Sequence, residues 1–340
     1  MDERVDPALR VVPYGGRVAI FRALPGLGDL LCTVPALRAL RAGRPDVEVI
    51  YIGLPETAPL VARYSAYVDR FLPFPGFPGL PERRADVLRL SGFLAEAQSF
   101  SLDLSVQLHG SGEQTNAVVA LLGARRMAGH YRAARPPGDA ALFLPWSDSC
   151  SEVRRALRLI AHLGCPSDDE SLEFPVAPSA ESELASVSEL DRARARPYVV
   201  LHPGSSTAER RWKADGFAEV GDHLAARGYG VVLTGTREER TLTTAVRAAM
   251  DREAVDVAGL TSLDGLAQLL VGASLLVCND TGVSHLAAAL RVPSVVVFRA
   301  SDPARWAPFD RDRHRPVRGS VRHVLAETRR LVHGVRVDAA

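Results

Sequence analysis

The chain has 340 residues, of which 47% are hydrophobic and 24% charged, and its formal net charge is +1. A chain of this length exceeds what one hydrophobic core normally serves, so we expect two domains. The near-neutral charge provides no electrostatic basis for binding nucleic acid or an acidic membrane surface, and it disfavours both of those function classes.

The chain carries no clear targeting or metal-binding signal. The first residues lack the basic and then apolar pattern of a secretory signal, and no apolar run reaches the roughly 18 residues that span a bilayer. We therefore expect a cytoplasmic protein, with peripheral contact at the inner face of the membrane left open. Cys32, Cys150, Cys165 and Cys278 form no C-x-x-C pair or His/Cys cluster, so we expect free thiols and assign no metal site.

Apolar runs and segments of helical periodicity alternate through the first half of the chain. The pattern predicts strands over 18–21, 47–52, 68–72, 102–108 and 125–130, and helices over 29–40, 56–63, 83–99, 113–122 and 152–163. The prolines of segments 74–79 and 132–145 predict irregular loops there.

A glycine-rich loop joins the first predicted strand to the first helix. Gly26 and Gly28 give G-x-G, but Leu31 occupies the position of the third glycine in a dinucleotide-binding fingerprint. This difference disfavours a dinucleotide-dependent oxidoreductase. The loop ends in Asp29, which is either a helix cap or a catalytic carboxylate.

The strand predicted over 102–108 is followed directly by polar residues, among them His109 and Ser111. Because ligands gather at the carboxyl ends of parallel strands, we expect both residues at the same edge of the sheet as Asp29. A lone histidine in such a loop more often forms structural hydrogen bonds than takes part in catalysis, so both interpretations of His109 stay open.

A proline-punctuated segment, 174–180, suits a domain boundary, and the alternation restarts after it. The pattern predicts strands over 198–202, 230–234, 254–257, 274–278 and 294–298, and helices over 181–194, 214–227, 238–250, 263–271, 283–290 and 321–332. The Arg/Asp-rich segment 311–318 is expected to be an exposed loop. The two alternating halves predict an α/β fold of two doubly wound, Rossmann-like domains facing across a cleft.

The loop after the strand 198–202 offers groups that suit a diphosphate. Small and hydroxyl residues fill positions 203–208, and Arg210 and Arg211 precede Trp212. The two guanidinium groups can clamp a diphosphate bidentately, or they can be a solvated pair beside a packed tryptophan.

The turn at 279–282 joins the strand 274–278 to the following helix. Asp280 or Thr281 can cap that helix, and Gly282 lets backbone come close to a ligand. The first N–H groups and the positive end of the helix dipole then face open space, an arrangement that holds an anion such as phosphate. A capped junction without a ligand is the alternative.

In chain order, these loops resemble those of glycosyltransferase family 9, whose best-known members are the ADP-heptose:lipopolysaccharide heptosyltransferases. The resemblance extends from about residue 17 to residue 300. The matching segments are 26–29 with 35–40, 108–111, 202–205 with 210–212, and 280–285, which fits the family's D-[ST]-G-x-x-H signature.

The resemblance implies a GT-B architecture and a role for each matched residue. It implies that Asp29 is the catalytic residue and that the second domain holds the diphosphate of a nucleotide sugar. The donor-binding residues that it implies are Gly28, His202, Gly204, Ser205, Arg210, Asp280, Thr281, Gly282 and His285, with Glu238 or Glu239 near the ribose. On the acceptor side it implies His109 and Ser111.

The activity implied is an inverting, metal-independent transfer of a sugar, with heptose from ADP-heptose favoured, onto a hydroxyl of a glycan or small molecule. No D-x-D-type acidic pair stands at a strand end, and no cofactor is expected. A nucleotide-sugar 2-epimerase stays open, because His109, His202 and His285 offer acid/base groups. A non-catalytic nucleotide-sugar-binding protein also stays open, although the presence of Asp29 disfavours it.

The domain assignment that follows has three parts. Residues 1–175 are expected to bind the acceptor and residues 176–318 the nucleotide sugar, while 319–340 form a C-terminal helix and tail that can pack back on the first domain. The expected partners are the donor and a carbohydrate or small-molecule acceptor. We expect a monomer without an integral membrane segment.

Overall fold

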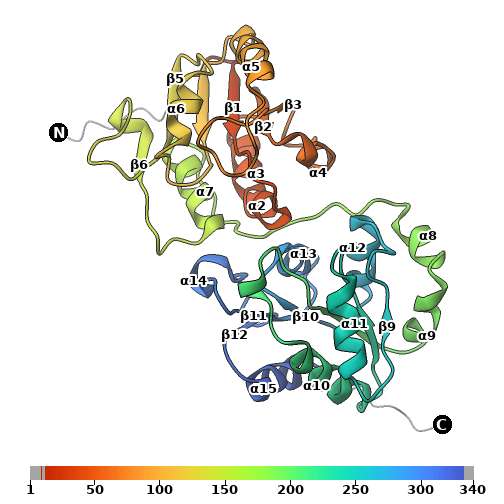
Figure 1. The fold of residues 1–340 in the computed structure, drawn as a ribbon. Helices are drawn as coiled ribbons and strands as arrows, with labels where there is room; N and C mark the ends of the chain where they lie inside the picture. The colour runs from red at the N-terminus through yellow and green to blue at the C-terminus, as the bar shows by residue number, and fades with distance from the viewer. Residues whose placement is uncertain (1–8, 10–11, 333–340) are drawn as a thin grey trace. The chain divides into compact units, whose positions relative to one another are not determined.

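The computed structural model describes residue 9 and residues 12–332. Contacts between Cα atoms divide the chain into two units, Met1–Glu170 and Ser171–Ala340. The division falls a few residues before the predicted boundary. Each unit contains one six-stranded sheet in which every strand pairing is parallel (Figure 1).

The first sheet has the strand order β3-β2-β1-β4-β5-β6. Its strands are β1 (Arg17–Phe21), β2 (Glu48–Gly53), β3 (Arg70–Pro73), β4 (Leu104–Gln107), β5 (Arg126–Tyr131) and β6 (Phe143–Pro145). The central strand β1 is buried along its apolar residues, and Ile20 lies between Tyr51 of β2 and Val106 of β4. Apolar runs of this kind are typical of a parallel sheet covered on both faces.

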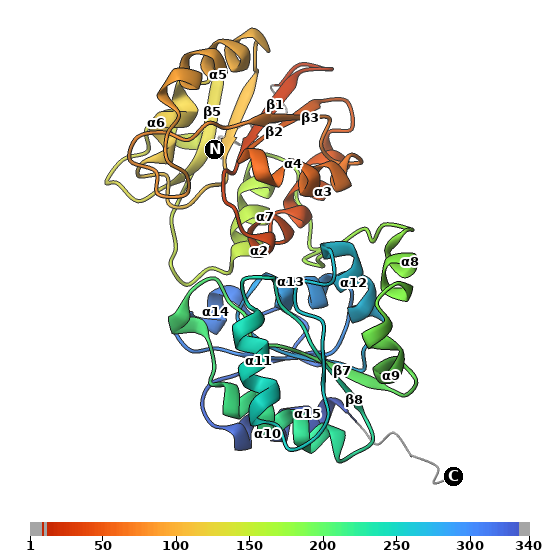
Figure 2. The same cartoon turned by 45° about the vertical axis from the view of Figure 1, so that its right-hand side comes forward.

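Helices cover both faces of the first sheet. Its helices are α2 (Leu27–Leu31), α3 (Val34–Gly43), α4 (Ala58–Val61), α5 (Val87–Ser99), α6 (Thr115–Ala120) and α7 (Glu152–His162), with short 3-10 helices at Pro55–Thr57, Ala62–Tyr64 and Ala140–Leu142. Phe93 of α5 and Val118 of α6 belong to one core cluster with Phe21 of β1, while α3 packs against α7 on the other side of the sheet (Figure 2).

The second sheet has the strand order β12-β11-β10-β7-β8-β9. Its strands are β7 (Tyr198–His202), β8 (Gly230–Leu233), β9 (Val255–Asp256), β10 (Leu275–Asn279), β11 (Ser294–Val297) and β12 (His314–Val317). Counted within their own units, both sheets therefore have the order 3-2-1-4-5-6, which is the dinucleotide-fold order with a topological switch point between its first and fourth strands.

Two groups of helices cover the second sheet. The helices of this unit are α8 (Ala180–Ala185), α9 (Asp191–Arg194), α10 (Ala214–Ala225), α11 (Arg240–Ala249), α12 (Leu263–Val271), α13 (Gly282–Ala289), α14 (Pro303–Trp306) and α15 (Val321–Leu331), with 3-10 helices at Ser188–Leu190 and Ala208–Arg210. Phe217, Val246 and Val324 bring α10, α11 and α15 into one core with the strands. On the other face, α12 accepts a hydrogen bond from the Tyr198 hydroxyl at Leu269 O, and α12 contacts α13 (Figure 2).

Several predicted elements differ from the structure. The helix predicted over 29–40 is two helices, because Pro35 in the first turn of α3 has no N–H with which to continue the preceding turn. The segment 132–145 contains the short strand β6, and the segment 311–318 contains the edge strand β12 with His314 and Val317 buried. An edge strand tolerates Pro316 and arginines because one side of it needs no strand partner. Because these residues are also typical of loops, the sequence did not predict the strand.

The sequence left open that the C-terminal helix packs back on the first domain. Within its own unit, α15 packs on α10, β11 and β12, with Val324 fully buried in that core. Residues 333–340 of the predicted tail lie outside the described residues. Within the described part of the chain, no helix is both long and apolar enough to cross a bilayer.

Candidate active site

The switch point of the first unit lies where β1 and β4 end. After β1, the loop 22–26 leads into α2, whose first turn carries Asp29 with 24% of its side chain exposed. Gly26 lies directly beneath this carboxylate, since a Cβ atom added to Gly26 would be 2.3 Å from Asp29 Oδ2. Gly28 is buried within the same short helix. The structure therefore presents the predicted base at the carboxyl edge of the sheet.

Arg22 anchors Asp29 to this edge. Its buried guanidinium donates from Nε to Asp29 O at 3.0 Å and from Nη1 to Leu108 O at 2.5 Å, so it ties the ends of β1 and β4 together. Its Nη2 lies 3.5 Å from Asp29 Oδ1 and 3.7 Å from Glu152 Oε2. Burial lowers the pKa of Arg22, but the carboxylates of Asp29 and Glu152 outweigh this effect and raise the pKa overall.

His109 braces the same edge rather than facing open solvent. Its Nδ1 accepts from Ala23 N at 3.2 Å, its Nε2 lies 3.0 Å from Glu82 Oε1, and its ring stacks on Phe21 at 5.7 Å. Burial lowers the pKa of His109, more than the neighbouring Glu82 raises it. The neutral tautomer with the proton on Nε2 satisfies both contacts. Both ring nitrogens are thus engaged in holding the loop.

Ser111, the second residue predicted on the acceptor side, donates to Glu113 Oε2 at 2.9 Å. This contact is local and exposed. The structure brings Ser111 to the edge of the sheet, as expected, but gives it no contact with Asp29 among the described hydrogen bonds.

A cavity of about 270 Å³ opens beside this edge. Its wall includes His130, Trp146, Arg155 and Arg158, and the Arg155 guanidinium stacks over the Trp146 ring at 3.8 Å. Burial lowers the pKa of His130 to about 4. The sequence did not predict this cavity. The sequence feature that could have indicated the cavity is Arg155, a charged residue on the apolar face of the helix 152–163.

Asn279 holds the two loops at the switch point of the second unit. Its Oδ1 accepts from Trp212 N at 2.9 Å, and its Nδ2 donates to Pro203 O at 2.8 Å. Asn279 is fully buried at the end of β10, so it links the loop after β7 to the turn before α13. The sequence alone does not predict this role, because a single asparagine at a strand end is a common turn residue.

The turn before α13 is arranged to receive an anion. Thr281 is the N-cap residue, with φ −155° and ψ 171°, and its side chain makes no capping hydrogen bond. Arg210, whose side chain is 34% exposed, places Nη1 3.8 Å from Oδ2 of the buried Asp280. Ser205 is buried against this turn, with Oγ 3.5 Å from Asp280 O. The uncapped helix start and the guanidinium together favour a negatively charged ligand.

Glu239, and not Glu238, lies at this edge. Glu239 Oε2 accepts from Thr236 N at 2.9 Å and lies 3.9 Å from His202 Nε2, whereas Glu238 is exposed. A Cβ atom on Gly204 would be 2.2 Å from Glu239 Oε1, so only glycine lets the loop and the carboxylate approach this closely.

His202 is buried beneath the same carboxylate. Its Nδ1 lies 3.1 Å from Thr234 Oγ1, and burial lowers its pKa more than Glu239 raises it. His285 is buried one turn into α13, and its ring meets Trp306 edge-on at 6.2 Å. Both predicted histidines therefore lie at the switch point, but neither is a solvent-facing acid or base in this arrangement.

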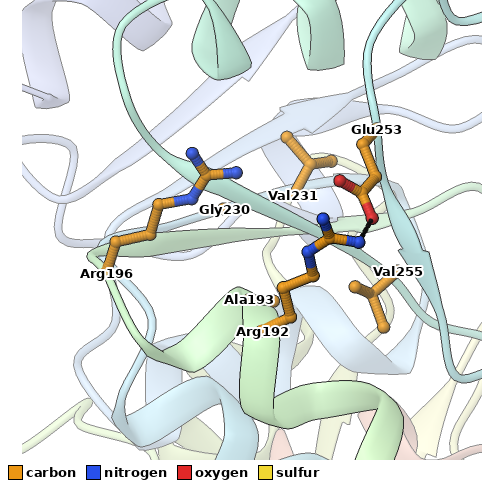
Figure 3. A pocket seen from close by; sticks show the side chains of 7 residues that line it. All are labelled: Arg192, Ala193, Arg196, Gly230, Val231, Glu253 and Val255. Carbon is orange, nitrogen blue, oxygen red and sulfur yellow. Dashed lines mark hydrogen bonds and ion pairs between the residues drawn. The ribbon is translucent and has the colours of Figure 1, made fainter.

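A hollow elsewhere in the second unit does not offer a comparable site. A hollow between α9 and the first residues of β8 and β9 contains the Arg192–Glu253 ion pair at 2.6 Å, with Arg196 beside Gly230 (Figure 3). Its volume is about 10 Å³, which is room for one water molecule, and it lies at the amino edge of the sheet. Among the described residues, no three His, Cys, Asp or Glu side chains cluster to hold a metal ion.

Comparisons with known proteins identify the family of the chain. Residues 111–327, more than half of the chain, match Glycosyltransferase family 9 (heptosyltransferase). Lipopolysaccharide heptosyltransferase 3 of Escherichia coli is 25% identical over 293 residues, which cover 83% of both chains.

Two solved structures share the fold. The glycosyl transferase family 9 protein from Veillonella parvula DSM 2008 superposes with a TM-score of 0.75 at 19% identity, covering 94% of this chain and 98% of its own. The E. coli ADP-heptose LPS heptosyltransferase II superposes with a TM-score of 0.73 at 21% identity, covering 93% and 98%. Together with the two parallel sheets, these likenesses confirm the predicted GT-B fold. The chain belongs to glycosyltransferase family 9, the heptosyltransferase family, and is a glycosyltransferase.

Proposed function

We propose that the chain transfers heptose from ADP-heptose to a hydroxyl of a lipopolysaccharide-type acceptor, with inversion at the anomeric carbon and without a metal ion. This proposal rests on two complementary groups, one at the switch point of each unit. The first unit presents a carboxylate, Asp29, and the second unit presents an uncapped helix start beside Arg210. The donor and acceptor classes are suggested by the relatives, which are named as lipopolysaccharide heptosyltransferases.

The second unit binds the donor in this proposal. The diphosphate of ADP-heptose lies at the start of α13, where the N–H groups around Thr281 and Gly282 and the Arg210 guanidinium face its negative charge. Glu239 accepts hydrogen bonds from the ribose, because it is the carboxylate that reaches the loop at Gly204. Asp280 is buried, so its role is to orient Arg210 rather than to meet the donor.

The first unit supplies the base. Asp29 takes the proton of the acceptor hydroxyl while that oxygen forms a bond to the anomeric carbon, and the bond from this carbon to the diphosphate oxygen breaks. ADP leaves with the electron pair, and the fixed positive groups of the second unit stabilise its developing charge. A positioned base of this kind contributes about 10²–10⁴-fold to the rate. Attack on the face opposite the diphosphate gives inversion.

The acceptor side of the proposal involves the cavity at the ends of β5 and β6, in the same unit as Asp29. Arg155, Arg158 and Trp146 give it both positive charge and a flat apolar surface, which suits an anionic sugar. We also propose that the enzyme is cytoplasmic, because its donor is a soluble nucleotide sugar, and that it is a monomer. Light scattering of the purified protein checks the monomer.

Release of ADP tests the proposed reaction. The protein is incubated with ADP-heptose alone, and then with ADP-heptose and heptose-free lipopolysaccharide, in buffer with and without EDTA. A transferase releases ADP only when acceptor is present, and EDTA leaves the rate unchanged. An epimerase alters the sugar without acceptor, and a binding protein does neither. Proton NMR of the product gives the anomeric configuration, and retention would contradict the proposed single displacement.

A further inference from the structure

Four charged side chains of the first unit form a continuous chain of ion pairs. Asp29 Oδ1 lies 3.5 Å from Arg22 Nη2, and the same Nη2 lies 3.7 Å from Glu152 Oε2. Glu152 also pairs with Nη1 of Arg155, three residues along α7. Arg22, Glu152 and Arg155 have side chains that are only 5–6% exposed, so solvent screens these interactions little.

Arg22 is shared between two carboxylates and is not closely bound by either. Both separations exceed the roughly 3.2 Å limit of a strong charge-assisted hydrogen bond. The strong hydrogen bonds of Arg22 go to the backbone, at Asp29 O and Leu108 O. The guanidinium is thus held in place by carbonyl groups, and its Nη2 group, which carries two hydrogens, faces both carboxylates without reaching hydrogen-bond distance to either of them.

The other titratable groups around Asp29 are uncharged in this arrangement. Tyr51 of β2 and His109 after β4 are both close enough to interact electrostatically with Asp29. Burial raises the pKa of Tyr51 and lowers that of His109, so both are neutral near pH 7. His130, which faces Glu152 and Arg155, is also neutral, because burial lowers its pKa to about 4. The balance of charge at Asp29 therefore depends on Arg22, Glu152 and Arg155.

We propose that Glu152 is a positioning residue for the transfer reaction. Glu152 attracts the Arg22 guanidinium and so keeps Arg22 from forming a tight ion pair with Asp29. The Asp29 carboxylate then stays available to the acceptor hydroxyl. This inference rests on the proposed role of Asp29 as base. Arg155 acts at the other end of the chain, since its pull on Glu152 weakens the hold of Glu152 on Arg22. Arg155 also lines the cavity, so the chain connects the acceptor side to the base.

Two substitutions should have different effects on the Arg22–Asp29 contact. Glu152→Gln removes the competing charge, so Arg22 Nη2 moves from 3.5 Å to about 2.8 Å from Asp29. Arg155→Gln removes the second arginine that pairs with Glu152, so Glu152 should attract Arg22 more strongly, and the Arg22–Asp29 separation should stay at 3.5 Å or lengthen. Glu152→Gln removes one negative charge from beside two buried arginines. The double variant Glu152→Gln, Arg155→Gln also removes one positive charge, so it restores the net charge of the cluster. It should keep the short contact between Arg22 and Asp29.

The test combines crystal structures with kinetics on the full-length protein. With ADP-heptose and heptose-free lipopolysaccharide, Glu152→Gln and the double variant should lower kcat about tenfold and change KM for ADP-heptose less than about twofold. The acid side of their pH–rate profiles should move to lower pH. Glu152→Asp should recover part of the rate. Arg154→Gln is the matched control, because Arg154 is on the same helix and pairs with Glu170 at the surface.

The outcomes separate this inference from the proposed function. An unchanged Arg22–Asp29 distance, or a lower kcat in Glu152→Gln without movement of the pH profile, overturns the role of Glu152 even if Asp29 is essential. Full activity of Asp29→Asn overturns the proposed function itself. If the wild type transfers nothing to this acceptor, the distances in the variant structures still decide whether Glu152 keeps Arg22 and Asp29 apart.

Discussion

The close contact between Gly26 and Asp29 allows the position of the base to be tested without altering the base. A Cβ atom on Gly26 would lie 2.3 Å from Asp29 Oδ2, and contacts of Cβ atoms under 3.0 Å are essentially absent from proteins. In Gly26→Ala the carboxylate must therefore move by at least the difference, 0.7 Å. The backbone of Gly26, with φ −77° and ψ 135°, is one that alanine adopts without strain.

The expected effect is on catalysis and not on folding. A displacement of about 1 Å in a reacting group can lower a rate about 10²-fold, so we expect kcat of Gly26→Ala to fall about 10- to 100-fold. The KM for ADP-heptose should stay within about twofold, because the donor is held by the other unit in the proposed reaction. Loss of glycine freedom in the unfolded chain should leave the stability equal to wild type or about 0.4–1 kcal/mol higher.

The assay is the initial rate of ADP release with ADP-heptose and heptose-free lipopolysaccharide, beside a thermal unfolding curve. Gly92→Ala is the control, because a Cβ atom there would meet nothing within 4 Å. A Gly26→Ala protein that is folded and retains the wild-type kcat would refute the position assigned to the reacting carboxylate.

Three further predictions concern the second unit. Arg210→Ala should weaken ADP binding by about 1.5–3 kcal/mol in calorimetry. The control Lys213→Ala, at an exposed residue just past Trp212, should leave ADP binding unchanged. If Arg210→Ala binds ADP as tightly as wild type does, Arg210 is not part of the site. Gly204→Ala should displace Glu239 and weaken binding of ADP-heptose without unfolding the protein, and an unchanged Kd would contradict the ribose contact. Burial lowers the pKa of His314 from 6.5 to about 4, so the unfolded state takes up a proton first and stability should fall as pH decreases through this window. The melting temperature of His314→Gln should depend less on pH there, and an identical pH dependence would argue against this origin.

The alternation of apolar runs predicted most of the fold because a parallel sheet buried on both faces leaves little ambiguity about its central strands. The strand Tyr198–His202 and the helix Leu263–Val271 have the predicted bounds. The two strands that were missed, β6 and β12, lie at the edges of their sheets. Strand β12 combines buried His314 and Val317 with Pro316, a pattern that describes an exposed loop equally well. Its strand character depends on pairing with β11, which is a tertiary contact.

The candidate site shows the same division between local and long-range information. The glycine-rich loop and the turn at 279–282 are local patterns, and the structure places both at switch points. The choice of Glu239 over Glu238 required the fold, because it depends on contact with Gly204 across the sheet edge. The ion-pair chain through Glu152 joins residues about 120 positions apart along the sequence, as the residue numbers of Asp29 and Glu152 show, so no spacing rule could have found it.

In the proposed mechanism, the carboxylate of one unit activates an acceptor for attack on a donor whose diphosphate is held by the other. This mechanism is tested most directly by the rate of ADP release from Asp29→Ala at saturating ADP-heptose and heptose-free lipopolysaccharide. Saturation separates the chemical step from donor affinity, which should change less than about tenfold in calorimetry with ADP. The proposed mechanism predicts that Asp29→Ala releases ADP at a rate at least about 10²-fold below wild type. A folded Asp29→Ala protein whose rate stays within about threefold of wild type would contradict it.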